Sequence, residues 1–149
     1  MEAENPDDLW SIRRYLSPAV GRLRPHKINE DIVVPRSRVG DYLESMERLQ
    51  QETGLLISCF GHVGDGNLHV NLMIDRSNQS ECELAERVKR RIFELAVEMG
   101  GTISGEHGIG IMKSEFLPLA LSQETIEAMK RIKRALDPHN ILNPGKIFP

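Results

Sequence analysis

Four stretches of the chain repeat apolar residues at intervals of three and four, which predicts amphipathic helices. They cover residues 6–21, 37–53, 80–99 and 122–136. In the first stretch the predicted apolar face consists of Leu9, Ile12, Leu16 and Val20.

Residues that typically begin or end helices stand at the borders of these stretches. Asn5 is the expected cap of the first helix, and Gly54 follows the second as a stop. Ser80 and Glu83 match a capping box, so the third helix is expected to begin at Ser80. Ser122 is the expected cap of the last helix.

Two shorter apolar segments are expected to be strands, and residues 28–35 are expected to be extended. Residues 55–60 form a continuous apolar run, and the Gly-rich residues 61–66 form a turn after it. Residues 67–74 alternate, which predicts a strand with two different faces. The apolar face would carry Leu68, Val70, Leu72 and Ile74, and the other face Asn67, His69, Asn71 and Met73.

The order of these elements favours an α+β fold over a doubly wound one, because the segments that connect them vary in length. We expect one domain over residues 1–149, built on a ferredoxin-like antiparallel sheet covered by helices. In a chain of 149 residues, folding can bury roughly 68–70% of the surface, so a core is feasible.

Charge and composition argue against some partners and some cellular locations. A net charge of −3 with no basic cluster argues against nucleic acid as a partner. The acidic N-terminus lacks the features of a secretory signal, and no apolar run approaches the roughly 20 residues that span a bilayer. Cys59 and Cys82 have no CxxC partner, which fits a reducing compartment. We therefore expect a cytoplasmic protein.

The candidate chemistry lies in two Gly-rich segments, GHVGDGNLHVN (residues 61–71) and GGTISGEHGIG (residues 100–110). A tight hairpin would bring the imidazoles of His62 and His69 together, with Glu106 as the natural third metal ligand. Two histidines and one carboxylate leave coordination positions open, as in catalytic zinc sites, and they also suit non-haem iron. The alternative is that these are solvated histidines in ordinary turns, and spacing alone does not decide between the two.

Three segments in order resemble the C-terminal domain of FAD-linked oxidases of the vanillyl-alcohol oxidase type: GHVGDGNLHVN, GGTISGEHGIG and LDPHNILNPGKIF. The resemblance runs from Leu9 to Lys146 and is greatest to glycolate oxidase catalytic subunits, D-lactate dehydrogenases and D-2-hydroxyglutarate dehydrogenases. It implies the substrate and metal half of an FAD-dependent D-2-hydroxyacid dehydrogenase, acting on glycolate or D-lactate. The flavin-binding domain is then expected outside these residues, and the chain alone is expected to be inactive.

The resemblance also implies roles for individual residues. The metal ligands would be His62, His69 and Glu106, with zinc as the first choice and iron or manganese as alternatives. His107 would be the catalytic base. The substrate-binding residues would be Arg13, Ser17, Lys27 and Asn71. The tail residues that reach the flavin half would be Asn143 and Lys146.

The partners implied are a small 2-hydroxyacid and the flavin-binding domain of the same polypeptide. An oxidase complex would add other subunits and a peripheral association with the membrane. Two other functions stay open: a non-catalytic ferredoxin-like ligand-binding or assembly module, and a metallohydrolase that uses the same histidines. Elsewhere, Ser104 is interpreted as shaping its loop, Lys113 and Glu115 as surface residues, and Met112 and Phe116 as core.

Overall fold

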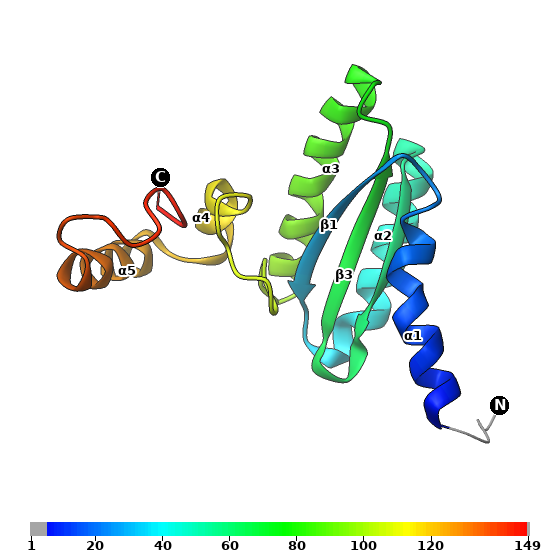
Figure 1. Ribbon diagram of the computed structural model, residues 1–149, viewed down its shortest axis with the longest axis horizontal. Coiled ribbons are helices and arrows are strands. Elements are labelled where there is room, and N and C mark those ends of the chain that lie inside the picture. Colours follow the sequence, from blue (N-terminus) through cyan, green and yellow to red (C-terminus); the bar gives the residue numbers. More distant parts are fainter. Residues whose placement is uncertain (1–5, 149) are drawn as a thin grey trace.

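The computed structural model describes residues 6–148, with side chains from residue 10 onward. Asn5, the expected cap of the first helix, and the side chain of Leu9 lie outside the described residues. At the centre is an antiparallel sheet in the order β1-β3-β2 (Figure 1). Its strands are β1 (His26–Val33), β2 (Leu56–His62) and β3 (Asn67–Ile74). The α+β class is therefore confirmed.

The helices are α1 (Pro6–Val20), α2 (Val39–Thr53), α3 (Gln79–Glu98), α4 (Leu117–Ala120) and α5 (Gln123–Leu136). Short 3-10 turns lie at η1 (Arg36–Arg38), η2 (Val63–Asp65) and η3 (Ser114–Phe116). The order β1-α2-β2-β3-α3 is that of a ferredoxin-like fold up to its fourth strand. In the place of that strand, Thr102 makes an isolated antiparallel bridge with Val33 at the edge of β1.

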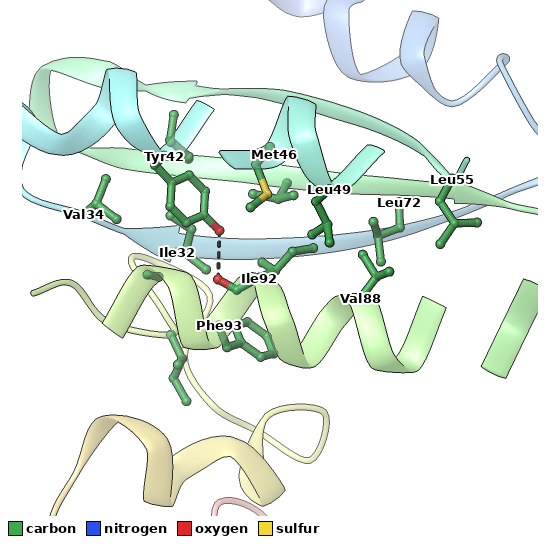
Figure 2. Packing of buried hydrophobic residues seen from close by; sticks show 14 of the residues in the cluster. Ile32, Val34, Tyr42, Met46, Leu49, Leu55, Leu72, Val88, Ile92 and Phe93 are labelled. Atoms are coloured by element: carbon green, nitrogen blue, oxygen red, sulfur yellow. Dashed lines mark hydrogen bonds between the residues drawn. The ribbon is translucent and has the colours of Figure 1, made fainter. Parts of the chain in front are cut away.

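One face of the sheet packs against α2 and α3 and forms the hydrophobic core (Figure 2). The predicted apolar face of β3 lies here, and its members are at most 2% exposed: Leu68, Val70, Leu72 and Ile74. The hydroxyl of Tyr42 donates a hydrogen bond of 3.0 Å to the carbonyl of Ile92, which joins α2 to α3. Each fully buried apolar side chain contributes roughly 1.5–3 kcal/mol, so this layer is a stable support for the opposite face.

The opposite face of the sheet is polar, and α1 lies across part of it (Figure 1). The strand register places Asp31 of β1 beside His69 of β3, and His69 beside Phe60 of β2. This face is more enclosed than its polarity predicts, because Asn67 is 6% exposed and Asn71 is fully buried.

Helix α1 buries less than its apolar pattern predicts. Ile12 is 64% exposed and Leu16 is 39% exposed, whereas Val20 is buried. The amine of Lys27 donates a hydrogen bond of 3.0 Å to the hydroxyl of Ser17, which connects β1 to α1.

Helix α3 begins one residue before the predicted start and has a different cap. The side chain of Asn78 accepts a hydrogen bond of 3.3 Å from the backbone N–H of Glu81. The predicted capping box is wrong, because Ser80 lies inside the helix and Glu83 accepts a hydrogen bond from Gln79 instead. The other predicted cap is confirmed, since the hydroxyl of Ser122 accepts a bond from the N–H of Thr125.

The substitution Asn78→Ala is therefore expected to destabilise the fold by about 0.5–2 kcal/mol, because the N–H of Glu81 loses its acceptor. Ser80→Ala should change the free energy of unfolding by less than about 0.5 kcal/mol, as is usual for surface positions. Urea unfolding of both variants measures the difference. If Ser80→Ala lost more free energy of unfolding than Asn78→Ala, Ser80 would be the cap after all.

The C-terminal part of the chain extends to one side of the sheet (Figure 1). Its tail is tied back by a hydrogen bond of 2.7 Å from the N–H of Ile147 to the carbonyl of Gly110. Phe116 is buried as predicted, but Met112 is 67% exposed and Lys113 only 5% exposed, so both of those predictions are wrong. Among residues 6–148, no helix combines the length and apolar character that crossing a membrane requires.

Candidate active site

The three predicted metal ligands converge where β2, β3 and the Gly-rich segment 100–110 meet. His62 ends β2, His69 lies within β3, and Glu106 projects from the segment. Oε1 of Glu106 lies 3.1 Å from Nε2 of His69 and 3.8 Å from Nε2 of His62. The ligand atoms of the three residues all lie within 4.8 Å of one another. We call these three residues the histidine cluster.

The histidine cluster fits a divalent metal ion. Two ligand atoms bound to a tetrahedral zinc ion at about 2.1 Å stand roughly 3.4 Å apart. The observed separations of 3.1 and 3.8 Å lie on either side of that value. Imidazole nitrogen and carboxylate oxygen also suit iron or manganese, so the donor atoms do not select one metal.

The β2–β3 hairpin sets the positions of the two histidines. The turn brings the ring centroids of His62 and His69 to 5.9 Å from each other. At its end Gly66 has φ +75°, and a Cβ there would stand 2.0 Å from the carbonyl oxygen of Val34. A residue with a side chain would meet both strain and a clash, which explains the glycine.

His69 is the most enclosed member of the histidine cluster. Its side chain is 12% exposed, against 37% for His62 and 50% for Glu106. Burial lowers the pKa of His69, although the carboxylates of Glu106 and Asp31 oppose the shift. Burial therefore favours the neutral imidazole, which is the form that binds metal ions. Its Nδ1 is buried and has no hydrogen-bond partner in the described part of the chain.

His107, the predicted base, stands at the open edge of the cluster. Its ring stacks on that of His69, with centroids 5.2 Å apart and planes inclined by 19°. Its Nε2 lies 3.7 Å from Oε1 of Glu106, and its side chain is 44% exposed. The imidazole is therefore accessible to a small molecule that also touches the cluster.

A residue that the sequence did not single out, Asp31, contacts the loop that carries Glu106 and His107. One oxygen, Oδ2, accepts hydrogen bonds of 2.8–3.1 Å from Ser104 Oγ and from the backbone N–H groups of Gly105, Glu106 and His107. The other oxygen accepts one from the side chain of Asn67. Burial alone would raise the pKa of Asp31, but these bonds, that from His107 foremost, lower it well below its usual range.

Gly105 allows the loop to approach the sheet this closely. A Cβ at this position would stand 2.1 Å from Nδ2 of Asn67 and 2.9 Å from Oδ1 of Asp31. The hydroxyl of Ser104 joins the same contact, which agrees with its interpretation as a loop-shaping residue. The absence of a side chain at Gly105 therefore allows the loop backbone to reach the buried carboxylate of Asp31.

A second set of potential ligands, Asp31, His69 and His107, also has its ligand atoms within 4.8 Å of one another. It is less suitable for a metal ion, because the carboxylate of Asp31 already accepts five hydrogen bonds. A metal ion there would compete with these donors, which are buried or part-buried, and leaving such donors without an acceptor is costly. Glu106 has no such commitment in the described contacts and is the better third ligand.

A pocket of about 480 Å³ opens beside the histidine cluster, between α1 and the polar face of the sheet. Two predicted substrate residues, Arg13 and Ser17, line it together with the cluster and His107. Lys27 lines the neighbouring cleft along the edge of β1 and reaches this pocket only through Ser17. Asn29 lines both hollows and was missed, because a single asparagine in a predicted extended segment carries no signal.

Asn71, the fourth predicted substrate residue, does not line the pocket. It is fully buried on the face that carries His69, and its amide donates hydrogen bonds to the carbonyls of Ser58 and His69. Its Oδ1 is buried and accepts no hydrogen bond within residues 6–148. The structure therefore places Asn71 beneath the pocket rather than at its surface.

The predicted flavin-side residues, Asn143 and Lys146, do not join the histidine cluster. Lys146 lines a separate cleft between α5 and the tail. Asn143 has φ 49°, and its carbonyl accepts a hydrogen bond from the N–H of Lys146. Their contact with a flavin remains a prediction.

Known proteins resemble this chain over nearly its whole length. It is 46% identical over 140 residues to the glycolate oxidase subunit GlcD of Bacillus subtilis (strain 168), a match that covers 94% of the chain and 30% of that protein. It is 36% identical over 154 residues to the mitochondrial D-lactate dehydrogenase [cytochrome] of Arabidopsis thaliana, covering 100% of the chain and 27% of that protein. The chain thus spans less than a third of the length of these relatives.

A solved structure supports the fold. The 4-ethylphenol oxidase from Gulosibacter chungangensis, in its isoeugenol complex, matches 99% of this chain and 31% of its own with a TM-score of 0.62 and 19% identity. Residues 1–147 match the family described as FAD linked oxidases, C-terminal domain. With the fold, the ordered motifs and this match in agreement, the chain belongs to the C-terminal domain family of FAD linked oxidases.

Proposed function

We propose that this chain is the substrate and metal half of an FAD-dependent D-2-hydroxyacid dehydrogenase that oxidises glycolate or D-lactate to the 2-oxoacid. The observation that carries the proposal is the convergence of His62, His69 and Glu106 beside His107 in one pocket. The family and the relatives named for glycolate, D-lactate and D-2-hydroxyglutarate support the class of substrate.

The residues of the pocket can divide the work of binding and proton transfer. The guanidinium of Arg13 suits the substrate carboxylate, because its fork of donors matches two carboxylate oxygens. The imidazole of His107 takes the proton of the α-hydroxyl, because histidine is the side chain that most often serves as a general base and this one lies at the open edge of the cluster. Asn71 lies beneath the pocket in the same strand as His69, and its amide donates a hydrogen bond to the carbonyl of His69.

Two groups would complete the chemistry. His62, His69 and Glu106 would hold a divalent ion, zinc in the first instance, which would supply Lewis-acid stabilisation of negative charge. A flavin-binding domain of the same polypeptide would hold FAD, which would supply the acceptor for a hydride. The chain's own part is to hold the hydroxyacid and remove its proton. We also propose a cytoplasmic location and, in an oxidase complex, further subunits.

The experiment that tests this function uses the flavoprotein formed by this chain and its flavin-binding domain. Anaerobic addition of glycolate or D-lactate is expected to bleach the flavin absorbance, and L-lactate to do so far more slowly. Removing the metal with a chelator should slow the bleaching, and added Zn²⁺ or Mn²⁺ should restore it. Flavin that stays oxidised with every 2-hydroxyacid would overturn the proposal.

Arg13→Ala is expected to raise KM for the hydroxyacid by about 10–100-fold, the range expected when one charge-assisted interaction is lost. Arg87→Ala is the matched control, because Arg87 is exposed on α3, which covers the other face of the sheet. Steady-state kinetics of both variants measure the effect. An unchanged KM for Arg13→Ala would remove Arg13 from the carboxylate site.

A further inference from the structure

We propose that Asp31 is a positioning residue for the metal site: it fixes the loop 104–107 on the sheet so that Glu106 meets His62 and His69. This inference rests on the proposed metal-binding function, and the test below separates the failure of one from the failure of the other. No described hydrogen bond joins the side chain of Asp31 to a side chain of the histidine cluster; its carboxylate holds the loop through the backbone N–H groups of residues 105–107.

The hydrogen bonds of Asp31 reach the two loop residues whose side chains lie at the proposed site, Glu106 and His107. The carboxylate of Asp31 accepts the backbone N–H groups of both Glu106 and His107, each at 2.9 Å. The side chain of Glu106 is 50% exposed, so packing alone constrains it little. Because its backbone is held at one buried point, its carboxylate stays within reach of His69 at 3.1 Å.

The sheet makes this point of attachment rigid. Asp31 is fully buried in β1 and lies directly across from His69 in β3, so ligand and anchor belong to one strand pair. Asn67, also in β3, bonds the second oxygen of Asp31 and the carbonyl of Ile32, which fixes the orientation of the carboxylate. The carboxylate of Asp31 therefore connects the loop that carries Glu106 to the strand pair that carries His69.

A buried carboxylate that collects several N–H donors could also serve stability alone. The chain offers a control for that explanation in Glu30, the neighbouring residue on the other face of β1. Glu30 is 3% exposed and lies 3.9 Å from the amine of Lys113, but no described hydrogen bond joins its side chain to the loop 104–107. Losing the charge of Glu30 perturbs a buried acid without releasing Glu106.

The test measures Zn²⁺ affinity of the purified 149-residue chain by isothermal titration calorimetry, with the folded fraction of each variant matched by circular dichroism. Asp31→Asn is expected to weaken Zn²⁺ binding about 10–100-fold, as removal of outer contacts to metal ligands typically does. Glu30→Gln should stay within about threefold of wild type, because it leaves the ligands in place. The visible spectrum of bound Co²⁺ should change for Asp31→Asn and not for Glu30→Gln.

A milder pair of variants covers the case in which Asp31→Asn does not fold. Ser104→Ala removes one hydrogen bond to Asp31 and should weaken Zn²⁺ binding roughly three- to tenfold. Ser114→Ala, which removes a hydroxyl bonded to the carbonyl of Ile111, should leave the affinity unchanged.

The outcomes are distinguishable. Wild-type chain that binds no Zn²⁺, or binds it equally well after His69→Ala, contradicts the proposed function itself. Wild-type binding that depends on His69 but is the same in folded Asp31→Asn, or the same in Ser104→Ala and Ser114→Ala, overturns the role of Asp31 alone. Weakened binding in Asp31→Asn with intact binding in Glu30→Gln supports it.

Discussion

His107→Ala is expected to lower kcat of the flavoprotein by about 10²–10⁴-fold, the contribution typical of a positioned general base. His107 is the imidazole at the open edge of the pocket, stacked on His69 and 3.7 Å from the carboxylate of Glu106. The substitution would remove the proposed acceptor for the hydroxyl proton and leave the proposed metal ligands in place. The measurement is kcat for D-lactate and glycolate, with the metal content of the variant determined in parallel.

The control for that experiment is His139→Ala. His139 is exposed in the turn after α5 and lines none of the described site. Its kcat should equal that of the wild type. Near-wild-type kcat in His107→Ala, with metal and flavin still bound, would show that another group takes the proton.

His69→Ala is expected to abolish stoichiometric metal binding by this chain. His69 is the least exposed of the three proposed ligands, and its Nε2 lies 3.1 Å from Oε1 of Glu106, so its loss leaves one half-exposed histidine and one exposed carboxylate. The fall in affinity should exceed the roughly 10–100-fold that outer contacts contribute. Metal analysis after dialysis against micromolar Zn²⁺ measures the loss.

His26→Ala serves as the comparison for His69→Ala. His26 begins β1, and its Nδ1 accepts a hydrogen bond from the N–H of Arg76, away from the histidine cluster. It should keep full metal content. Equal metal in both variants would mean that the ion binds elsewhere on the chain.

Local patterns in the sequence predicted most of the fold. The alternation from Asn67 to Ile74 identified β3 and its two faces, since side-chain period is a property of the strand itself. The cap of α3 was predicted at Ser80, and the structure shows Asn78 in that role. Both are good caps, and the residue that precedes the first helical turn depends on how the chain leaves β3.

The sequence predicted that His62, His69 and Glu106 converge, but it did not predict the contacts that hold them in place. His62, His69 and Glu106 stand in Gly-rich segments whose motifs are visible in the sequence. Asp31 accepts hydrogen bonds from residues that follow it by 73 to 76 positions in the chain. No local sequence pattern predicts a contact over that separation.

The burial of Lys113 also depends on contacts between distant parts of the chain. Its amine donates to the carbonyls of Asp31 and Ile103 at 2.8 and 2.9 Å, so a residue predicted at the surface is buried. Burial lowers the pKa of Lys113, while Glu30 and Asp31 oppose the shift. A lysine in an irregular segment is expected at the surface, and only the folded position of β1 supplies its acceptors.

The most direct test of the metal site is anomalous X-ray diffraction at the zinc absorption edge from crystals of this chain grown with Zn²⁺. If the three residues bind zinc, one strong peak is expected about 2.0–2.2 Å from Nε2 of His62, Nε2 of His69 and a carboxylate oxygen of Glu106. A peak bound to the carboxylate of Asp31, or density between the two histidines that shows no anomalous signal, would contradict this expectation.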